Sequence, residues 1–440
     1  MVDIHTVITV FNGFGRGIAD FLHPVFNYSF YVFLFIAIAA SAAYYFISVY
    51  AIFFDKTKKK RYEDLDEDKA PFVTIQIPTK NETVALRCAQ HCLEFDYPKN
   101  KYEIIIGDDS TEKKISAAIS KFARQHKQVK VTRRGTNEGY KAGNLNYMLK
   151  HSKGELIVLF DSDFTPSEDF LRRIVAPFQQ DKNLGAVQAR WNFLNPNQNL
   201  TSVLGSTIVS VFHHITLPFI NSRRNITFLC GSAEAVRKDV LIKLGGWESG
   251  SLTEDIEYSL RLLKNGYKID YLADLECYSE VPYKPKDLYK QQKRWAYGFV
   301  SAFKEHGKSI ITSEKLSAQD KAYINFTWTG YLLSVLLLLM FVTGFLSFIT
   351  HRPEAMDIPK FFYEMGRNAL LSSGIIFASV IAQVKSKNAR SLPSMFASSF
   401  SYGLVVTYHV NIGLYKVLTG KPMPWFLLNK QGNGDMGQKN

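Results

Sequence analysis

The feature that most constrains this chain is an uncharged apolar run from Tyr28 to Phe54. A helix needs roughly 20 apolar residues to cross a bilayer, so this run is long enough to span one. A basic cluster follows it, and basic residues beside a span stay on the cytoplasmic side. We therefore predict a transmembrane helix over 28–54, preceded by an extracytoplasmic or interfacial segment, 1–27. The cluster consists of Lys56, Lys58, Lys59, Lys60 and Arg61.

Further apolar runs occupy the last quarter of the chain. Residues 322–350 and 368–385 are predicted to be transmembrane helices. Basic residues between 385 and 390 return the chain to the cytoplasm. The run 391–418 is interrupted by polar side chains, which favours an interfacial or re-entrant helix, with a membrane span as the alternative. The interfacial arrangement leaves the tail, 419–440, on the cytoplasmic side.

The composition narrows the choice of ligands. The chain has 440 residues and a formal net charge of +13, which favours an anionic membrane face or a phosphate-bearing substrate over an acidic partner. The four cysteines form no CxxC pair and no Cys/His metal spacing, which is typical of a reducing compartment without structural zinc. Since the membrane flank and a phosphate-facing cleft account for the basic excess, no nucleic-acid partner is expected.

Residues 55–282 alternate between strand and helix patterns, the order that produces a mostly parallel sheet. Ligands of such domains bind at the carboxyl ends of the strands. Residues 283–321, which contain a QxxRW motif, are expected to form interfacial helices. The predicted strands are 72–78, 102–107, 129–132, 155–160 and 185–189, and the clearest helices are 84–95 and 116–126.

Two acidic motifs directly follow predicted strands, Asp108-Asp109-Ser110 and Asp161-Ser162-Asp163. Hard divalent cations prefer carboxylate oxygens and complete their shell with water and substrate phosphates. Asp163 with Asp161 is thus a candidate site for Mg²⁺ or Mn²⁺ against a diphosphate, and solvated turn acids are the alternative.

Three other motifs have chemistry suited to a sugar diphosphate. Lys141 precedes a helix start in a glycine-containing loop, where backbone N–H groups and one ammonium favour an anion. Glu254 and Asp255 open a helix, and one of them is a candidate general base. In the segment 291–295, the spacing places Gln291, Arg294 and Trp295 on one helical face, a combination that suits a diphosphate and a sugar ring.

The motif set resembles the processive inverting family-2 glycosyltransferases, which include cellulose, hyaluronan, mannan and glucan synthases. The resemblance covers about 73–303. Within it, 228–232 (FLCGS) resembles the acceptor segment of cellulose synthases and 187–191 (VQARW) resembles the glucomannan synthase-like branch. The tail segment 425–432 (WFLLNKQG) is similar to the family's gating loop.

The resemblance implies a GT-A (Rossmann-like) α/β catalytic domain in the cytoplasm, inserted between transmembrane helices. It also implies roles by position. Asp255 would be the catalytic base, with Glu254 beside it, and Asp163 and Asp161 would be the metal ligands. The nucleotide sugar would be bound by Thr79, Glu82, Asp109, Lys141, Asp161, Gln291 and Arg294; the acceptor by Cys230, Gly231 and Trp295; and gating would use Trp425 and Lys430.

The expected function is polymerisation of a β-linked polysaccharide from a nucleotide sugar, coupled to translocation across the plasma membrane. UDP-glucose is the favoured donor, with GDP-mannose and UDP-N-acetylglucosamine as alternatives. The expected partners are the donor, the growing glycan, the lipid bilayer and an oligomeric or secretion partner. Transfer of a single sugar to a lipid acceptor is the rival activity, and a transporter or anchor that only senses nucleotides is the rival class.

Overall fold

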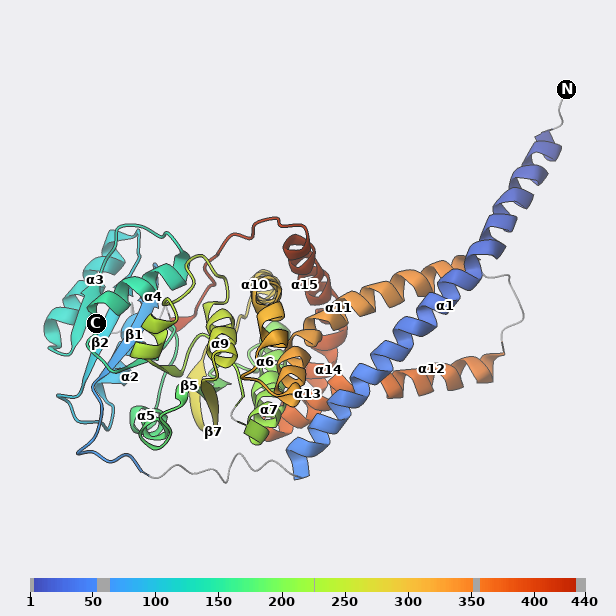
Figure 1. Cartoon of the computed structure of the whole chain (residues 1–440). Coiled ribbons are helices and arrows are strands. Elements are labelled where there is room, and N and C mark those ends of the chain that lie inside the picture. Colours follow the sequence, from blue (N-terminus) through green and yellow to red (C-terminus); the bar gives the residue numbers. More distant parts are fainter. Residues whose placement is uncertain (1–3, 54–63, 225, 351–356, 433–440) are drawn as a thin grey trace. The chain divides into compact units, whose positions relative to one another are not determined.

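The computed structural model describes residues 4–53, 64–224, 226–350 and 357–432 (Figure 1). It divides into two compact units. The first comprises Met1–Val49 with Thr329–Ala378, and the second comprises Tyr50–Trp328 with Ser379–Asn440. The basic cluster at 56–61, on which the predicted orientation depends, lies outside the described residues.

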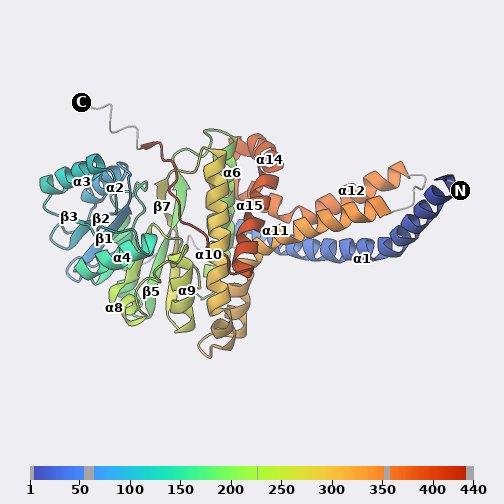
Figure 2. The same cartoon turned by 90° about the horizontal axis from the view of Figure 1, so that it is seen from above.

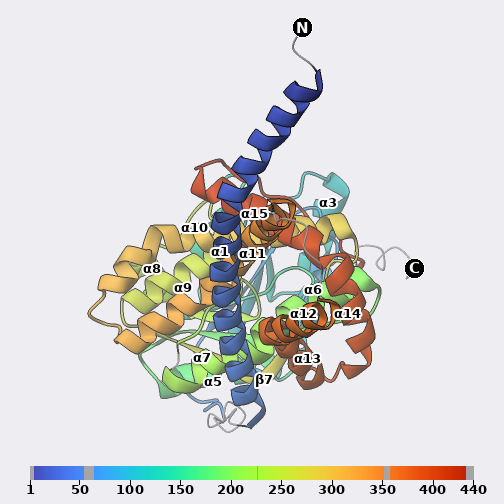
Figure 3. The same cartoon turned by 90° about the vertical axis from the view of Figure 1, so that its right-hand side faces the viewer.

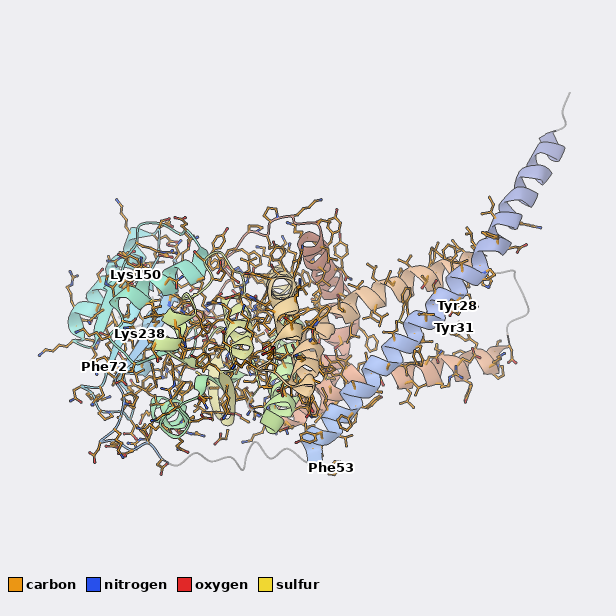
Figure 4. The ribbon with its side chains drawn as sticks, in the orientation of Figure 1. Tyr28, Tyr31, Phe53, Phe72, Lys150 and Lys238 are labelled. Atoms are coloured by element: carbon orange, nitrogen blue, oxygen red, sulfur yellow. The ribbon has the colours of Figure 1, made fainter. Side chains whose placement is uncertain are left out.

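The first unit consists of long apolar helices. Helix α1 (Ile4–Phe53) and α11 (Ala318–Thr350) lie side by side (Figure 2), and His23 Nδ1 is 3.0 Å from the Ser347 carbonyl. Figure 4 labels Tyr28 and Tyr31 on α1, whose side chains are exposed, as an apolar medium would require.

Three described helices are long and apolar enough to cross a membrane: Gly15–Phe53, Leu200–Ser222 and Gly330–Thr350. In the second of these segments, 89% of the most apolar 18-residue window is buried inside the protein, so the segment belongs to the core of the second unit. The run predicted as one helix over 368–385 is instead divided between α12 (Ile358–Ser372) and α13 (Gly374–Lys385), which meet at 53°. At the break between α12 and α13, the Gly374 N–H donates a hydrogen bond to Ser41 Oγ of α1 at 2.6 Å.

The second unit is built on a seven-stranded mixed sheet of order β3-β2-β1-β4-β6-β5-β7. All neighbouring strands are parallel except β6, which is antiparallel to β4 and β5. The sequence did not indicate β6, whose four residues include Glu234 and Arg237 and form no apolar run, and β7 was also missed. The strands are β1 (Val73–Thr79), β2 (Tyr102–Asp108), β3 (Val129–Thr132), β4 (Leu156–Leu159), β5 (Leu184–Phe193), β6 (Glu234–Arg237) and β7 (Lys268–Ser279).

Helices cover both faces of this sheet, so the central strands are buried, while the edge strand β3 is partly exposed. Helices α2 (Ala85–Leu93), α3 (Lys113–Gln125) and α5 (Phe170–Gln180) share one hydrophobic core with alternate residues of β1 and β2. Helix α4 (Tyr140–His151) packs on the other face, where Asn144 donates to the Gly107 carbonyl at 2.8 Å. The labels Phe72, Lys150 and Lys238 in Figure 4 mark the start of β1, the end of α4 and the start of α8 (Lys238–Lys243).

A layer of helices lies beyond β5 and β7. It contains α6 (Leu200–Val211), a π-helical turn (Phe212–Thr216), α7 (Leu217–Arg224) and α10 (Pro285–Thr312). The run 391–418 forms two helices, α14 (Leu392–Ser401) beside α6 (Figure 3) and α15 (Gly403–Leu418) along α10. Both are shorter than the roughly 20 residues of a span. The rings of His409 and Tyr289 of α10 stack with their centroids 5.0 Å apart. This contact gives a packing role to one of the polar residues that interrupt the apolar run 391–418.

Candidate active site

The predicted site residues gather where β1, β2 and β4 end. Thr79 is the last residue of β1, Asp109 follows β2, and Asp161 and Asp163 follow β4. Because these three strands are parallel neighbours, their carboxyl ends lie at one edge of the sheet. The edge therefore collects several carboxylates in one place.

The Lys141 ammonium links two carboxylates of this site, those of Asp161 and Glu254. Its Nζ lies 2.8 Å from Asp161 Oδ1 and 3.1 Å from Glu254 Oε1, and it donates to the Gly231 carbonyl at 2.5 Å. The loop that presents it turns through two left-handed residues, Gly139 (φ 65°) and Tyr140 (φ 53°). Burial alone would lower the pKa of Lys141, but Asp161 and Glu254 outweigh burial and raise it. The ammonium thus stays charged, as a diphosphate site requires.

The candidate base, Asp255, lies in the first turn of α9 (Glu254–Lys264). It faces the turn that precedes β6: a side chain added to Gly231, which has φ +84°, would meet Lys141 Nζ at 3.3 Å and Asp255 Oδ2 at 3.4 Å. Lys141 and Asp255 therefore both border Gly231, and a side chain at this position would crowd them. Cys230, beside it, is half-buried.

Asp255 has the acid–base character of a general base. Burial, followed by the charge of Glu254, raises the pKa of Asp255 to about 7. A carboxylate whose pKa lies near neutrality accepts a proton more readily than an ordinary aspartate, and a substantial share of it is still ionised in neutral solution.

Asp163 is paired with the tail. Lys430 Nζ donates to Asp163 Oδ1 at 2.6 Å and to Ser162 Oγ at 2.9 Å, and it lies 3.3 Å from Glu82 Oε1. The other oxygen, Asp163 Oδ2, accepts the Glu280 N–H at 3.0 Å. Burial would lower the pKa of Lys430, but Asp163 and Glu82 outweigh it and raise the pKa. Glu82 itself accepts a hydrogen bond from Ser162 Oγ at 2.5 Å.

The donor set at Asp161 and Asp163 suits Mg²⁺ or Mn²⁺ only when a phosphate completes the shell. Among the residues that the structure describes, no group of three or more His, Cys, Asp or Glu side chains is arranged to hold a metal ion. Two carboxylates with substrate phosphates and water are a common arrangement for Mg²⁺. Both carboxylates contact ammonium groups of the protein, Asp161 that of Lys141 and Asp163 that of Lys430.

The QxxRW motif lies on α10 and adjoins the base. Arg294 Nη1 donates to the Leu252 carbonyl at 2.8 Å, and Gly298 fits so closely against Thr253 that an added Cβ would lie 2.6 Å from it. Trp295 packs on a small apolar cluster formed by Phe193, Val209 and Val281. Gln291 is partly exposed on the same helix.

The tail also contributes an aromatic ring. Trp425 stacks on Tyr140 with ring centroids 6.3 Å apart and 17° between the planes, and Lys80 Nζ lies 5.8 Å from the Trp425 ring centroid. The tail thus places an aromatic ring beside Tyr140 and Lys80.

Several residues of the site were missed in the sequence. Asp287 accepts hydrogen bonds from the backbone N–H and side chain of Asn429, and Glu280 accepts the N–H groups of Gln431 and Gly432. These carboxylates matter only once the tail lies over the site, so no local pattern could reveal them. Arg134, which pairs with Asp109, had one signal: it follows a predicted strand, as the acidic motifs do.

A sheet of this topology with a lysine, paired strand-end carboxylates and a buried aspartate defines a GT-A glycosyltransferase. Residues 70–298, about half of the chain, match the family described as "Glycosyltransferase like family 2". The chain belongs to this family and is a glycosyltransferase with candidate membrane spans.

Its relatives in Arabidopsis thaliana are described as glucomannan mannosyltransferases. Glucomannan 4-beta-mannosyltransferase 7 is 27% identical over 409 residues, which cover 88% of this chain and 71% of the relative. The probable glucomannan 4-beta-mannosyltransferase 10 is 28% identical over 299 residues, 64% of this chain and 54% of the relative. The chain thus spans about half to three quarters of the length of these relatives.

A solved structure shares the fold. The mannosyltransferase PcManGT from Pyrobaculum calidifontis, determined in complex with GDP-Man and Mn²⁺, superposes with a TM-score of 0.61 at 20% identity. The match covers 89% of this chain and all of that one. At this identity the match establishes the GT-A fold of the chain and nothing about its donor.

Proposed function

We propose that this protein polymerises a β-linked, mannose-containing polysaccharide from GDP-mannose by inverting transfer at the membrane. The observation that carries the proposal is that Lys141 Nζ and the Asp255 carboxylate both border Gly231, so that a cation for the diphosphate and a base lie next to the same glycine. The names of the plant relatives move the preferred donor from UDP-glucose to GDP-mannose.

The transfer needs one base for the acceptor hydroxyl and cationic groups that stabilise the negative charge on the leaving diphosphate. The acceptor hydroxyl oxygen bonds to C1 of the donor sugar on the face opposite the diphosphate, and the C1–O bond to the diphosphate breaks. Asp255 takes the hydroxyl proton, while Lys141 and Arg294 bind the diphosphate that leaves with the bonding electrons. Because the attack is direct, the anomeric configuration inverts and no covalent enzyme intermediate is needed.

Asp161 and Asp163 would hold Mg²⁺ or Mn²⁺ with the donor. When bound, the ion neutralises charge that develops on the diphosphate. Thr79, Glu82 and Asp109 line the same strand edge, where the nucleoside would bind. Lys430 must leave Asp163 Oδ1, or share it, when the donor enters.

Elongation is proposed to rely on the acceptor residues and on the membrane helices. Trp295, with Cys230 and Gly231, would hold the terminal sugar through successive additions, since an aromatic face packs well on a sugar ring. Helices α1 and α11, with the bent pair α12–α13, would anchor the catalytic unit on the cytoplasmic side of the bilayer. The tail, with Trp425 and Lys430, would close over the bound donor.

The proposal is tested with the full-length protein in detergent or lipid nanodiscs. GDP-mannose, UDP-glucose and UDP-N-acetylglucosamine are supplied in turn with Mn²⁺, and nucleotide release and product length are measured. We expect turnover of GDP-mannose and a long glycan that a β-mannan hydrolase degrades. A single-sugar lipid product would replace the polymerase proposal with the lipid-acceptor activity, and preferred turnover of UDP-glucose would overturn the donor.

A further inference from the structure

Arg134 forms the most extensive side-chain contact network beside the site, and none of the sequence motifs includes it. It follows the edge strand β3, and its side chain is only 8% exposed. Its Nε lies 3.0 Å from Asp109 Oδ1 and its Nη2 lies 2.6 Å from Asp109 Oδ2, a two-pronged pairing. Such pairing fixes both the position and the plane of a carboxylate.

The same guanidinium holds the loop that carries Lys141. Arg134 Nη2 donates to the Tyr140 carbonyl at 2.8 Å, and Nη1 donates to the Glu138 carbonyl. These two carbonyls flank Gly139, so the contacts fall on the left-handed turn. A side chain on Gly143 would come within 2.4 Å of Arg134 Nη1, which shows how closely helix α4 begins against the guanidinium.

We propose that Arg134 is a positioning residue for the donor, because it ties the carboxylate of Asp109 to the loop that presents Lys141. The inference rests on the proposed function, in which Asp109 lies at the nucleoside end of the donor and Lys141 at the diphosphate end. One planar group then sets the distance between the two ends of the nucleotide site. Asp109 retains lone pairs for a nucleoside, since each carboxylate oxygen accepts more than one hydrogen bond.

Only arginine can do this. Four acceptor atoms face the side chain, namely both Asp109 oxygens and the two loop carbonyls. A guanidinium offers five N–H donors in a rigid plane, whereas an ammonium offers three on a flexible stem. Arg134→Lys therefore keeps the charge beside Asp109 and loses the contacts to the loop.

The neighbouring Arg133 supplies a matched control. Its Nε donates to Asp108 Oδ2 at 2.7 Å, and its Nη2 donates to the Ser116 carbonyl and to Ser120 Oγ, each at 2.8 Å. It thus also pairs with a strand-end aspartate, through one N–H and with a more exposed side chain, but its other contacts are to α3. Arg133→Lys changes the same chemistry without touching the loop.

The experiment has two readouts on the full-length protein. Hydrogen exchange of the amides of 135–143 is measured without nucleotide, and the affinities for GDP and UDP with Mn²⁺ are measured together with donor KM and kcat. We expect Arg134→Lys to speed exchange of this loop and to weaken nucleotide binding and raise donor KM about 10- to 100-fold, with kcat at saturating donor changed less than about threefold. Arg133→Lys should change none of these.

A double-mutant cycle that combines Arg134→Lys with Asp109→Asn tests whether Arg134 affects nucleotide affinity through Asp109. If Arg134 acts through Asp109, the second substitution adds little to the loss of nucleotide affinity already caused by the first. Unchanged loop exchange, or faster exchange with unchanged nucleotide affinity and donor KM, would overturn the positioning role. If the wild type transfers no sugar and binds neither nucleotide, the proposed function fails. The exchange comparison still decides whether Arg134 holds the loop, since unchanged exchange would refute it on its own.

Discussion

Lys430 Nζ lies 2.6 Å from Asp163 Oδ1, although 267 residues separate them in the chain. The contact joins the tail to the carboxylate that follows β4, and Asp287 and Glu280 hold the adjoining tail residues by hydrogen bonds. The Lys430 ammonium therefore binds one of the two Asp163 oxygens that a divalent cation would use. In the proposed function, the contact of Lys430 with Asp163 Oδ1 and the binding of a divalent cation would compete for the same oxygen.

The first prediction follows from this competition. Lys430→Ala should increase the affinity of the nucleotide-free protein for Mn²⁺ about 3- to 10-fold, because Asp163 loses its internal cation. Mn²⁺ binding is followed by electron paramagnetic resonance. Lys421→Ala, which removes a tail lysine that contacts Tyr415 instead of the site, is the control. Equal affinities in the three proteins would show that Lys430 does not compete.

The anchoring of the tail gives a second prediction. Glu280→Ala should expose the tail to trypsin, with cleavage after Lys430 several-fold faster, because the N–H groups of Gln431 and Gly432 lose their acceptor. The rate is measured by mass spectrometry of the released peptide. Glu276→Ala, on the same strand β7 but bonded to Asn192, should leave cleavage unchanged. Slow cleavage in the Glu280 variant would mean that other contacts hold the tail.

The base assignment predicts a sharp loss. Asp255→Asn should reduce transfer about 10²- to 10⁴-fold while nucleotide affinity stays within about threefold, since the base acts on the acceptor and not on the nucleotide. Turnover and GDP binding are measured on the same preparation. Retention of more than about a tenth of the turnover would exclude Asp255 as the base.

The raised pKa of Asp255 predicts the pH profile. Burial moves this pKa to about 7, so the base becomes protonated as the pH falls through 7. The value of kcat/KM for the donor should decline about tenfold per pH unit below that point and level off above it. Stopped assays between pH 5 and 9 test this expectation. A profile that stays flat down to pH 5 would contradict the assignment.

The acceptor-stacking role proposed for Trp295 predicts shorter products when its ring is removed. Trp295→Ala should shorten the polymer or abolish it, because the acceptor loses the aromatic face that holds it between additions. Trp295→Phe keeps a ring and should restore most of the length. Product size is read by gel filtration of labelled glycan. An unchanged length distribution in the Ala variant would favour a non-processive transferase.

Local patterns predicted much of the fold. The strands at 102–107 and 129–132 were placed within a residue of β2 and β3, because both are short runs rich in β-branched residues. The antiparallel β6, however, has four residues and depends on its neighbours β4 and β5 for its pairing. The 53° bend between α12 and α13 likewise involves the contact of Gly374 with Ser41, which no apolar count contains.

The sequence by itself determined which residue types lie at the edge of the sheet, because each acidic motif is continuous with the strand that carries it. It could not determine which of them meet. Lys430 reaches Asp163, Arg134 reaches Asp109, and Lys141 and Asp255 meet at Gly231 only after the chain has folded. These contacts join residues far apart in the chain, and their distances depend on how helices and strands pack. Tertiary structure therefore decided the pairing of charges in the site.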